Sequence, residues 1–171
     1  AICCAYDGVK AFFPEEKIVL TGNPVRKKMV DISGKKEESI AFFKLNPNKK
    51  TLLVIGGSLG ARSLNKCVRK NIDKLKNSDI QVIWQCGKFY HAKMSSFIER
   101  NKCENIHLHQ FIDRMDLAYS AADVIVSRAG AISVSELCVV GKPVILVPSP
   151  NVTDDHQTKN AMELVNKGAA V

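Results

Sequence analysis

Two short stretches of the sequence combine small residues with polar side chains in an order that suits phosphate or sugar binding. The first is Ser127 to Glu136, which lies between the apolar run Val124 to Val126 and a second apolar run. This pattern predicts a buried strand that breaks at a glycine and becomes a helix. N–H groups at a helix start lack intrahelical partners and lie at the positive end of the helix dipole, which attracts anions. An ordinary strand-to-helix turn has the same pattern.

The second stretch is the glycine-rich loop Gly56-Gly57-Ser58-Leu59-Gly60, which follows the apolar run Leu52 to Ile55. Glycines allow backbone to approach a ligand closely. The loop lacks the spaced GxGxxG of dinucleotide-binding proteins, and it does not end in Lys followed by Ser or Thr as a P-loop does. NAD binding and P-loop nucleotide binding are therefore disfavoured, and a tight turn without a ligand remains the alternative.

Two polar residues near these stretches have a structural explanation as well as a functional one. Ser133 to Glu136 has the spacing of a capping box, in which Glu136 bonds back to the Ser133 N–H. Gln157 stands in the same relation to Asp154, if Asp154 is the N-cap of a helix. Capping contributes about 1 kcal/mol, which is enough to keep these residue types without a ligand.

The composition is that of an ordinary globular domain. The 171 residues are 46% hydrophobic and 25% charged, which argues against disorder. No apolar run approaches the roughly 18 residues of a membrane span, and no signal peptide opens the sequence. The six cysteines and four histidines show no metal-ligand spacing. We expect a cytoplasmic protein with reduced cysteines and no metal.

The net charge of +8 is concentrated in the first 100 residues, away from Ser127 to Glu136. Aromatic residues are only 6%, and the lysines are spread along the chain instead of clustering with aromatics as in nucleic-acid binders. A solvated surface is therefore favoured, with an anionic membrane surface as the main functional alternative.

From Thr51 onward, short apolar runs alternate with segments of helical period. The expected strands are Leu52–Ile55, Ile80–Trp84, Ile106–Leu108, Val124–Val126 and Pro143–Val147. The expected helices are one whose face carries Leu64, Val68, Ile72 and Leu75, then Tyr90–Arg100, Met115–Ala122, one ending at Val140, and Asp155–Lys167. Repeated units of this kind predict an α/β fold with a doubly wound, parallel, Rossmann-like sheet. In the strand order 3-2-1-4-5-6, the first and fourth strands bring the two stretches together.

The first residues resemble the end of another structural unit. Short strands are expected at Ile2–Ala5 and Ile18–Thr21, with a helical turn at Val9–Phe13 between them, which is too little to fold alone. We expect residues 1–24 to be the tail of a preceding domain and a linker, and residues 25–171 to be the domain proper.

Six motifs in order carry a resemblance to one family. They are Thr21-Gly22-Asn23-Pro24-Val25-Arg26, Gly56 to Arg62 with Asn65, Phe111-Ile112 with Met115, Ser127 to Glu136, Gly141-Lys142-Pro143, and Asp155-His156-Gln157 with Asn160-Ala161. Together they cover nearly the whole chain and resemble the C-terminal half of the MurG family of N-acetylglucosaminyltransferases. The resemblance implies half of a two-domain GT-B glycosyltransferase, with residues 25–171 as a C-terminally truncated UDP-sugar donor-binding domain.

The resemblance implies a parent enzyme that transfers N-acetylglucosamine from UDP-GlcNAc to lipid I, undecaprenyl-diphospho-muramoylpentapeptide, in the peptidoglycan synthesis of dividing cells. The reaction would invert the anomeric centre without a metal or other cofactor. The parent would be peripheral on the anionic cytoplasmic face of the plasma membrane and would bind lipid I through an N-terminal domain. No catalytic residue is expected in the present chain, which would bind donor weakly and transfer nothing alone. No nucleic-acid partner is implied.

The resemblance also implies roles for single residues. Arg26 and Ser58 would lie near the diphosphate, with Gly57 and Gly60 in the loop beside it. The Ile112 backbone would contact the uracil edge, Glu136 the ribose hydroxyls and Gln157 the sugar. The helix start facing the diphosphate would comprise Ala131, Ile132, Ser133, Val134 and Ser135. Further candidates are Met115, Arg128, Gly130, His156 and Asn160.

Three alternatives remain open at this point. A donor-binding subunit of a two-chain N-acetylglucosaminyltransferase would have a similar half on its own polypeptide, although the strands before Gly22 resemble the end of a fused first domain. A UDP-GlcNAc 2-epimerase-like enzyme has the same fold, and assaying the parent for epimerisation against transfer would separate the two. A basic nucleic-acid module is the third.

Overall fold

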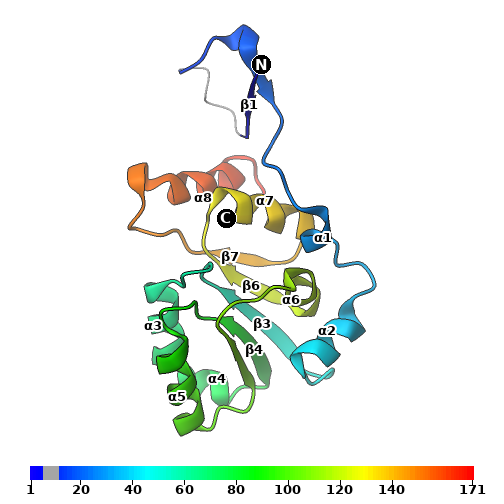
Figure 1. Cartoon of the computed structure of the whole chain (residues 1–171), viewed down its shortest axis with the longest axis vertical. Helices are drawn as coiled ribbons and strands as arrows, with labels where there is room; N and C mark the ends of the chain where they lie inside the picture. Colours follow the sequence, from blue (N-terminus) through cyan, green and yellow to red (C-terminus); the bar gives the residue numbers. More distant parts are fainter. Residues whose placement is uncertain (6–11) are drawn as a thin grey trace.

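Five parallel strands form the sheet on which the computed structural model is built, and residues 1–5 and 12–171 are described. The strands are β3 (Lys50–Ile55), β4 (Ile80–Gln85), β5 (Ile106–His109), β6 (Val124–Ser127) and β7 (Val144–Leu146). Their order is β5-β4-β3-β6-β7, and every neighbouring pair is parallel (Figure 1). The predicted doubly wound sheet is therefore confirmed, with the first and fourth strands of the sheet side by side.

Helices cover both faces of this sheet. One face carries α3 (Arg62–Lys70), α4 (Ile72–Lys76) and α5 (His91–Asn101). The other carries α1 (Lys27–Val30), α2 (Lys36–Phe43), α6 (Met115–Ala121) and α7 (Ala131–Val140). The turn η3 (Thr153–Asp155) and helix α8 (His156–Asn166) follow β7. Among the described residues, no helix is long and apolar enough to cross a membrane.

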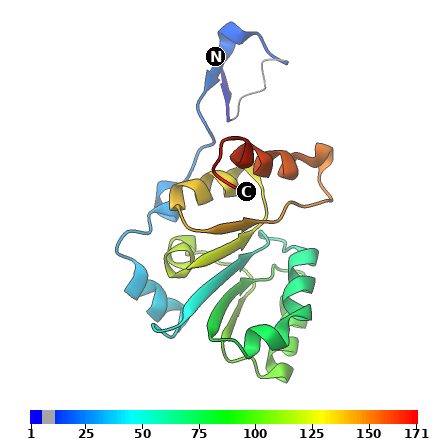
Figure 2. The same cartoon turned by 180° about the vertical axis from the view of Figure 1, so that it is seen from behind.

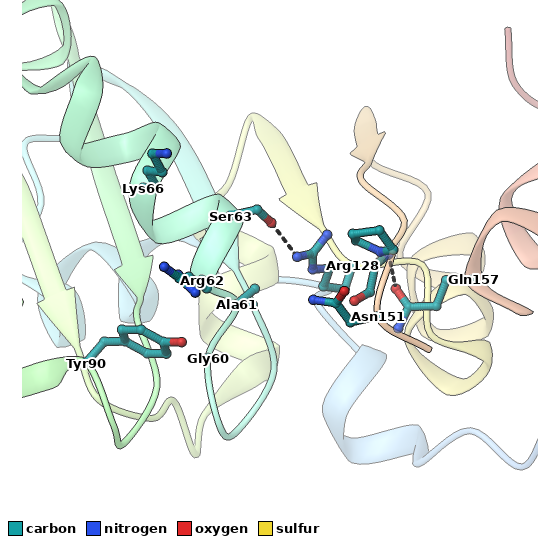
Figure 3. A pocket seen from close by; sticks show the side chains of 12 residues that line it. Gly60, Ala61, Arg62, Ser63, Lys66, Tyr90, Arg128, Asn151 and Gln157 are labelled. Atoms are coloured by element: carbon teal, nitrogen blue, oxygen red, sulfur yellow. Dashed lines mark hydrogen bonds between the residues drawn. The ribbon is translucent and has the colours of Figure 1, made fainter. Parts of the chain in front are cut away.

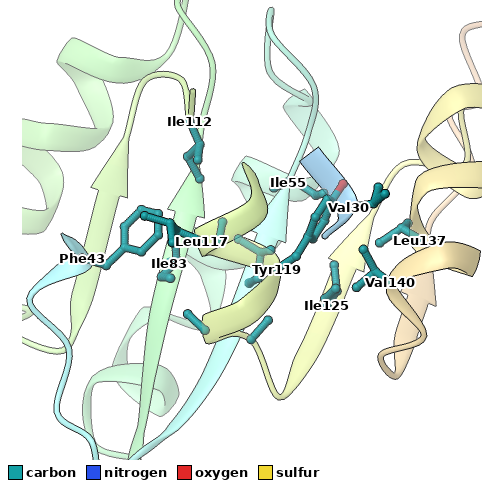
Figure 4. Close-up of a cluster of buried hydrophobic side chains, with 14 of the residues drawn as sticks. Val30, Phe43, Ile55, Ile83, Ile112, Leu117, Tyr119, Ile125, Leu137 and Val140 are labelled. Carbon is teal, nitrogen blue, oxygen red and sulfur yellow. The ribbon is translucent and has the colours of Figure 1, made fainter. Parts of the chain in front are cut away.

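The apolar core divides into two clusters because successive side chains of a strand point to opposite faces of the sheet. On β3, Leu53 and Ile55 belong to the cluster under α6, whereas Val54 belongs to the cluster under α3 and α5. Figure 4 shows the first cluster, in which Tyr119 of α6 lies between the sheet and α7. Tyr119 is almost fully buried in this cluster, so it helps to hold α6 against the sheet.

One predicted helix is divided. The segment carrying Leu64, Val68, Ile72 and Leu75 was expected to be continuous, but α3 ends at Lys70 and α4 begins at Ile72. The break lies at Asn71, whose backbone leaves the helical conformation and whose amide Nδ2 donates to the carbonyl oxygen of Cys67 at 3.0 Å. Asn is unfavourable in helix interiors and favours helix ends.

The N-terminal residues form a separate parallel pair of strands. β1 (Ile2–Cys4) pairs with β2 (Ile18–Leu20), which follows the turn η2 (Glu15–Lys17). Figures 1 and 2, which view the chain from opposite sides, both show this pair away from the five-stranded sheet. The two strands were predicted, whereas the helical turn expected at Val9–Phe13 falls largely outside the described residues. The division of the chain at residue 24 stays a prediction.

A buried amide joins α3 to the second strand of the sheet. Asn65 Nδ2 donates to the Cys86 carbonyl oxygen at 2.8 Å, and Trp84 Nε1 donates to Asn65 Oδ1 at 3.0 Å. Asn65 and Trp84 are both buried. Removing the amide would leave two buried polar groups without a partner, which is costly.

We expect Asn65→Ala to lower the free energy of unfolding by about 1 to 3 kcal/mol. Urea unfolding can be followed by the fluorescence of Trp84, the one tryptophan of the sequence. The control is Asn77→Ala, because Asn77 is exposed. Equal losses for both variants would contradict the role of the buried amide.

A buried carboxylate holds the start of α6 to the segment before α2. Asp116 Oδ2 lies 2.9 Å from Lys35 Nζ and 2.9 Å from Arg114 Nη2, and Arg114 Nε donates to Oδ1 at 2.9 Å. These hydrogen bonds, with that from Arg114 the largest contribution, hold the pKa of Asp116 well below its usual range.

A depressed folded-state pKa stabilises the protein above the unfolded-state pKa of about 3.9 and loses that contribution as the pH falls below it. We therefore expect Asp116→Asn to unfold at lower urea concentration than wild type at pH 7, and the difference to shrink as the pH falls below about 4. The comparison is Asp113→Asn, since Asp113 is exposed. A difference that stays constant from pH 7 to acid would disprove this linkage.

Candidate functional site

The carboxyl ends of β3 and β6 place the two predicted stretches against each other. Ile55 of β3 is the register partner of Ser127 of β6, so the loops that follow both strands start at the same level. Between them lies a cavity of about 310 Å³. Its lining is Ile55, Gly56, Gly57, Ser58, Gln85, Phe111, Ile112, Met115, Tyr119, Ser127, Arg128, Gly130, Ser133, Glu136 and Gln157. Parallel sheets bind ligands at this kind of switch point.

Helix α7 begins at the cavity without a side-chain cap. Gly130 is its N-cap residue, and it has no side chain with which to cap the helix. The first intrahelical bond runs from the Val134 N–H to the Gly130 carbonyl oxygen at 2.9 Å. Gly130 and Ser133 line the cavity, so the positive end of the helix dipole faces it.

Glu136 lies inside α7, so the capping-box interpretation is wrong. The helix starts at Ala131, which places Ser133 in its first turn and not at the N-cap. The Glu136 side chain turns inward instead, is 7% exposed, and accepts a hydrogen bond from the Tyr119 hydroxyl to Oε2 at 3.4 Å. Its other oxygen, Oε1, is buried without a hydrogen-bond partner and lies 3.7 Å from Arg26 Nη2.

This arrangement has an electrostatic consequence. Burial, and next the nearby negative charge of Glu136, raise the pKa of Tyr119, so its hydroxyl keeps its proton and remains a donor. The Tyr119 hydroxyl thereby bonds to Oε2 of Glu136, and Oε1 remains able to accept a hydrogen bond from a ligand. A buried acceptor without a partner is costly unless something satisfies it.

The capping interpretation of Gln157 is wrong as well. Helix α8 has Asp155, not Asp154, as its N-cap residue. The Gln157 Oε1 atom accepts from the Ser149 N–H at 2.9 Å, which ties α8 to the segment after β7. Gln157 lines both the 310 Å³ cavity and a neighbouring one of about 580 Å³.

The neighbouring cavity, shown in Figure 3, extends the site along the start of α3. Arg128 lies at the boundary of the two cavities. Its guanidinium donates to the carbonyl oxygens of Val147 at 3.0 Å and Pro148 at 2.8 Å, and to the Ser63 hydroxyl. Burial lowers its pKa, but an arginine remains charged at neutral pH.

The linker before α1 is attached to the start of α7. Asn23 Nδ2 donates to the Ala131 carbonyl oxygen at 3.3 Å and to the Ser135 hydroxyl at 3.0 Å. This attachment carries the chain past Glu136 and brings Arg26 beside it, with the Arg26 side chain 71% exposed. The motif Thr21 to Arg26 thus contacts α7, which lies more than 100 positions later in the sequence.

Several predicted residues lie around the cavity without lining it. Gly60 lines the neighbouring cavity, and Asn160 Nδ2 donates to the Ala129 carbonyl oxygen at 3.0 Å. Val134 is buried toward a groove beside α8. Ile132 is an exposed side chain, and Ser135 Oγ donates to the Ala131 carbonyl oxygen. His156 is the first residue of α8.

Gln85 and Tyr119 were missed by the sequence analysis. Gln85 is the last residue of β4, and its side chain contacts two of the loops around the cavity. A polar residue at the carboxyl end of a mainly apolar strand, directly after Val82, Ile83 and Trp84, was a signal for Gln85. Tyr119 had no such signal, because an aromatic residue in a helix is ordinarily core. In the described ranges 1–5 and 12–171, no three His, Cys, Asp or Glu residues gather as metal ligands would.

A family model described as the glycosyltransferase family 28 C-terminal domain matches residues 51–171. The chain belongs to this family. The matched range begins one residue into β3 and includes every loop around the cavity. The MurG resemblance found in the motifs therefore agrees with the family of the whole domain.

Curated relatives of this family 28 domain have closely similar sequences. An N-acetylmuramyl-(pentapeptide) pyrophosphoryl-undecaprenol N-acetylglucosamine transferase of Parabacteroides distasonis is 56% identical over 99% of this chain and 46% of the relative. One of the same name from Flavobacterium psychrophilum is 54% identical, over 99% of this chain and 46% of the relative. The family 28 domain thus spans about half the length of these relatives.

Solved structures agree with this assignment. The crystal structure of MurG from Acinetobacter baumannii is similar with a TM-score of 0.66 and 29% identity, over 98% of this chain and 45% of that chain. The glycotransferase of kitacinnamycin has a TM-score of 0.61 at 19% identity, over 92% of this chain and 36% of that chain, which shows the fold alone. The family 28 domain has the fold of the C-terminal half of a GT-B glycosyltransferase.

The glycine-rich loop packs against the next loop of the sheet with no room for a side chain. Gly60 has φ +84°, and a Cβ there would lie 2.1 Å from the Cys86 carbonyl oxygen. Gly34 also has a positive φ, +67°, but a Cβ there would meet no atom within 4 Å. A substitution at Gly34 therefore tests backbone strain alone, whereas a substitution at Gly60 tests backbone strain and steric overlap together.

We expect Gly34→Ala to lower the free energy of unfolding by about 1 kcal/mol, because only the left-handed backbone conformation is disfavoured. Gly60→Ala should lower it clearly more, because the two loops must also move apart. Both can be measured by urea unfolding. Equal losses for the two variants would show that the close packing of the loops contributes nothing.

Proposed function

We propose that the chain is the donor-binding domain of an enzyme that transfers N-acetylglucosamine from UDP-GlcNAc to lipid I in peptidoglycan synthesis. The observation that carries this proposal is the buried Glu136 oxygen without a hydrogen-bond partner, in a cavity that is also lined by the start of α7 and the glycine-rich loop. A ribose hydroxyl and a diphosphate are the two groups that these features suit. The names of the relatives supply the sugar and the acceptor.

The site divides into three parts along the donor. The diphosphate is placed between Ser58 and the start of α7, and Arg26 adds positive charge beside it. The ribose hydroxyls donate to Glu136, and uracil lies against the loop that carries Ile112. Gln157 is placed at the sugar end, on the side of the neighbouring cavity. Because the Ile112 N–H already donates to Gln85 Oε1 at 3.2 Å, the uracil either shares this N–H or uses the Ile112 carbonyl oxygen.

Catalysis of this reaction requires stabilisation of the leaving diphosphate. Preorganised dipoles and positive groups act where charge develops, and they need no reorganisation during the reaction. A helix terminus contributes at most about 2 kcal/mol, so α7 acts together with Arg26 and the loop N–H groups. We propose that these groups suffice without a metal ion or other cofactor.

Binding of the acceptor and of the membrane is assigned to the part of the longer protein that this chain does not cover. The chain spans 46% of the Parabacteroides distasonis relative, so we propose that the other part binds lipid I and supplies the catalytic base. We further propose that the whole enzyme acts as a peripheral protein on the cytoplasmic face of the membrane. The curated relatives described above are named transferases, so the epimerase alternative is not favoured. This chain covers 46% of each relative, so the similar half is part of a longer chain there, which does not favour the two-chain alternative.

Glu136→Ala should weaken UDP binding about tenfold or more, because hydrogen bonds to a charged group contribute about 1.5 to 3 kcal/mol. Isothermal titration calorimetry with UDP and 2′-deoxyuridine 5′-diphosphate measures this. Wild type should prefer UDP, and the variant should bind both equally, because the carboxylate discriminates through a ribose hydroxyl.

Glu99→Ala is the control, because Glu99 is an exposed glutamate on α5. It should leave both affinities unchanged. Absence of UDP binding by the wild-type chain would disprove the proposed function. A Glu136→Ala variant that still prefers UDP over the deoxy compound would instead remove only the ribose assignment.

A further inference from the structure

Strand β4 carries two buried glutamines, one near each end. Gln81 is 3% exposed and Gln85 is 4% exposed, whereas the residues between them, Val82, Ile83 and Trp84, are apolar and fully buried. Buried amides are costly unless both their donor and their acceptor are satisfied. Each glutamine must therefore be held by specific partners.

The Gln85 amide bonds to two loops that are distant in sequence. Its Nε2 donates to the Gly57 carbonyl oxygen at 3.0 Å, and its Oε1 accepts from the Ile112 N–H at 3.2 Å. Only one orientation of the amide satisfies both bonds, because a carbonyl oxygen needs a donor and an N–H needs an acceptor. One planar group thus fixes the distance between the Gly57 loop and the Ile112 loop.

Gly57 and Ile112 both line the 310 Å³ cavity, and Gln85 lies in the lining with them. In the proposed function, the Gly57 loop faces the diphosphate and the Ile112 loop faces the uracil. We propose that Gln85 is a positioning residue that sets the separation of the base and diphosphate subsites, and this inference rests on the proposed function. Gln85 acts through the two loops, and not by contact with reacting atoms.

The physical reason is that UDP is a ligand of nearly fixed span between its base and its phosphates. A protein that holds both subsites at that span binds UDP without first ordering two loops, and preorganisation of this kind raises affinity. Uridine contacts the base and ribose subsites only. A change in the distance between the two loops must therefore lower the affinity for UDP more than the affinity for uridine.

Gln81 is an internal control provided by the same strand. Its Oε1 accepts from the Asn46 N–H at 2.8 Å, and its Nε2 donates to the Asn46 carbonyl oxygen at 3.0 Å and to Thr51 Oγ1 at 2.9 Å. It is buried to the same degree and also bridges separate segments, but it lies at the amino end of β4, outside the lining of the cavity.

The test compares Gln85→Met with Gln81→Met in the full 171-residue chain. Methionine keeps the unbranched length of the side chain and removes both the donor and the acceptor. Calorimetry with UDP and with uridine gives the ratio of the two dissociation constants for wild type and each variant. Hydrogen exchange of the Ile112 amide, measured without ligand, reports the Gln85 bond directly, and urea unfolding gives the stability of both variants.

We expect both variants to lose stability, but only Gln85→Met to lose UDP affinity, by about tenfold or more, with a smaller loss for uridine. The Ile112 amide should exchange faster in Gln85→Met than in Gln81→Met. An unchanged ratio of UDP to uridine affinity, or unchanged exchange at Ile112, would overturn the inference while the proposed function stands. Failure of wild type to bind either compound would instead overturn the proposed function, and with it the inference.

Discussion

The parallel pairing of β3 with β6 is the constraint on which the site depends. Because Ile55 and Ser127 are register partners, the glycine-rich loop and the start of α7 leave the sheet at the same level and face each other. A one-residue slip would turn every side chain of a strand to the opposite face. The two apolar clusters prevent such a slip, since Leu53 and Val54 each fit one face only.

Around this pairing, buried polar groups fix the loops more than apolar contacts do. Asn65, Gln85 and Tyr119 each bond a segment of the site from within the core. Hydrogen bonds in a buried environment are directional, and leaving one unmade is costly, so these side chains specify loop positions that apolar packing alone would leave loose. The site is therefore preorganised by residues that lie behind its surface.

Glu136 shows how the same tertiary contacts turn an ordinary residue into a functional candidate. A glutamate in a helix usually points to solvent. Here Tyr119 from α6 and Arg26 from the linker surround the carboxylate, and one oxygen is left with neither water access nor a hydrogen-bond partner. The ribose contact proposed for this position rests on this unsatisfied acceptor.

The sequence alone determined the β-α alternation and the parallel sheet, because apolar period and glycine placement are local signals, and its ordered motifs indicated the family. The strand order was assumed as the common one, and the structure established it. It did not determine that the predicted helix divides at Asn71, because the apolar period continues through this position while the backbone there leaves the helical conformation. For Glu136 and Gln157, the sequence also left two interpretations open, helix capping and ligand binding. Only the tertiary structure decided against capping, because the helix starts and the inward direction of both side chains depend on partners 8 to 17 positions away.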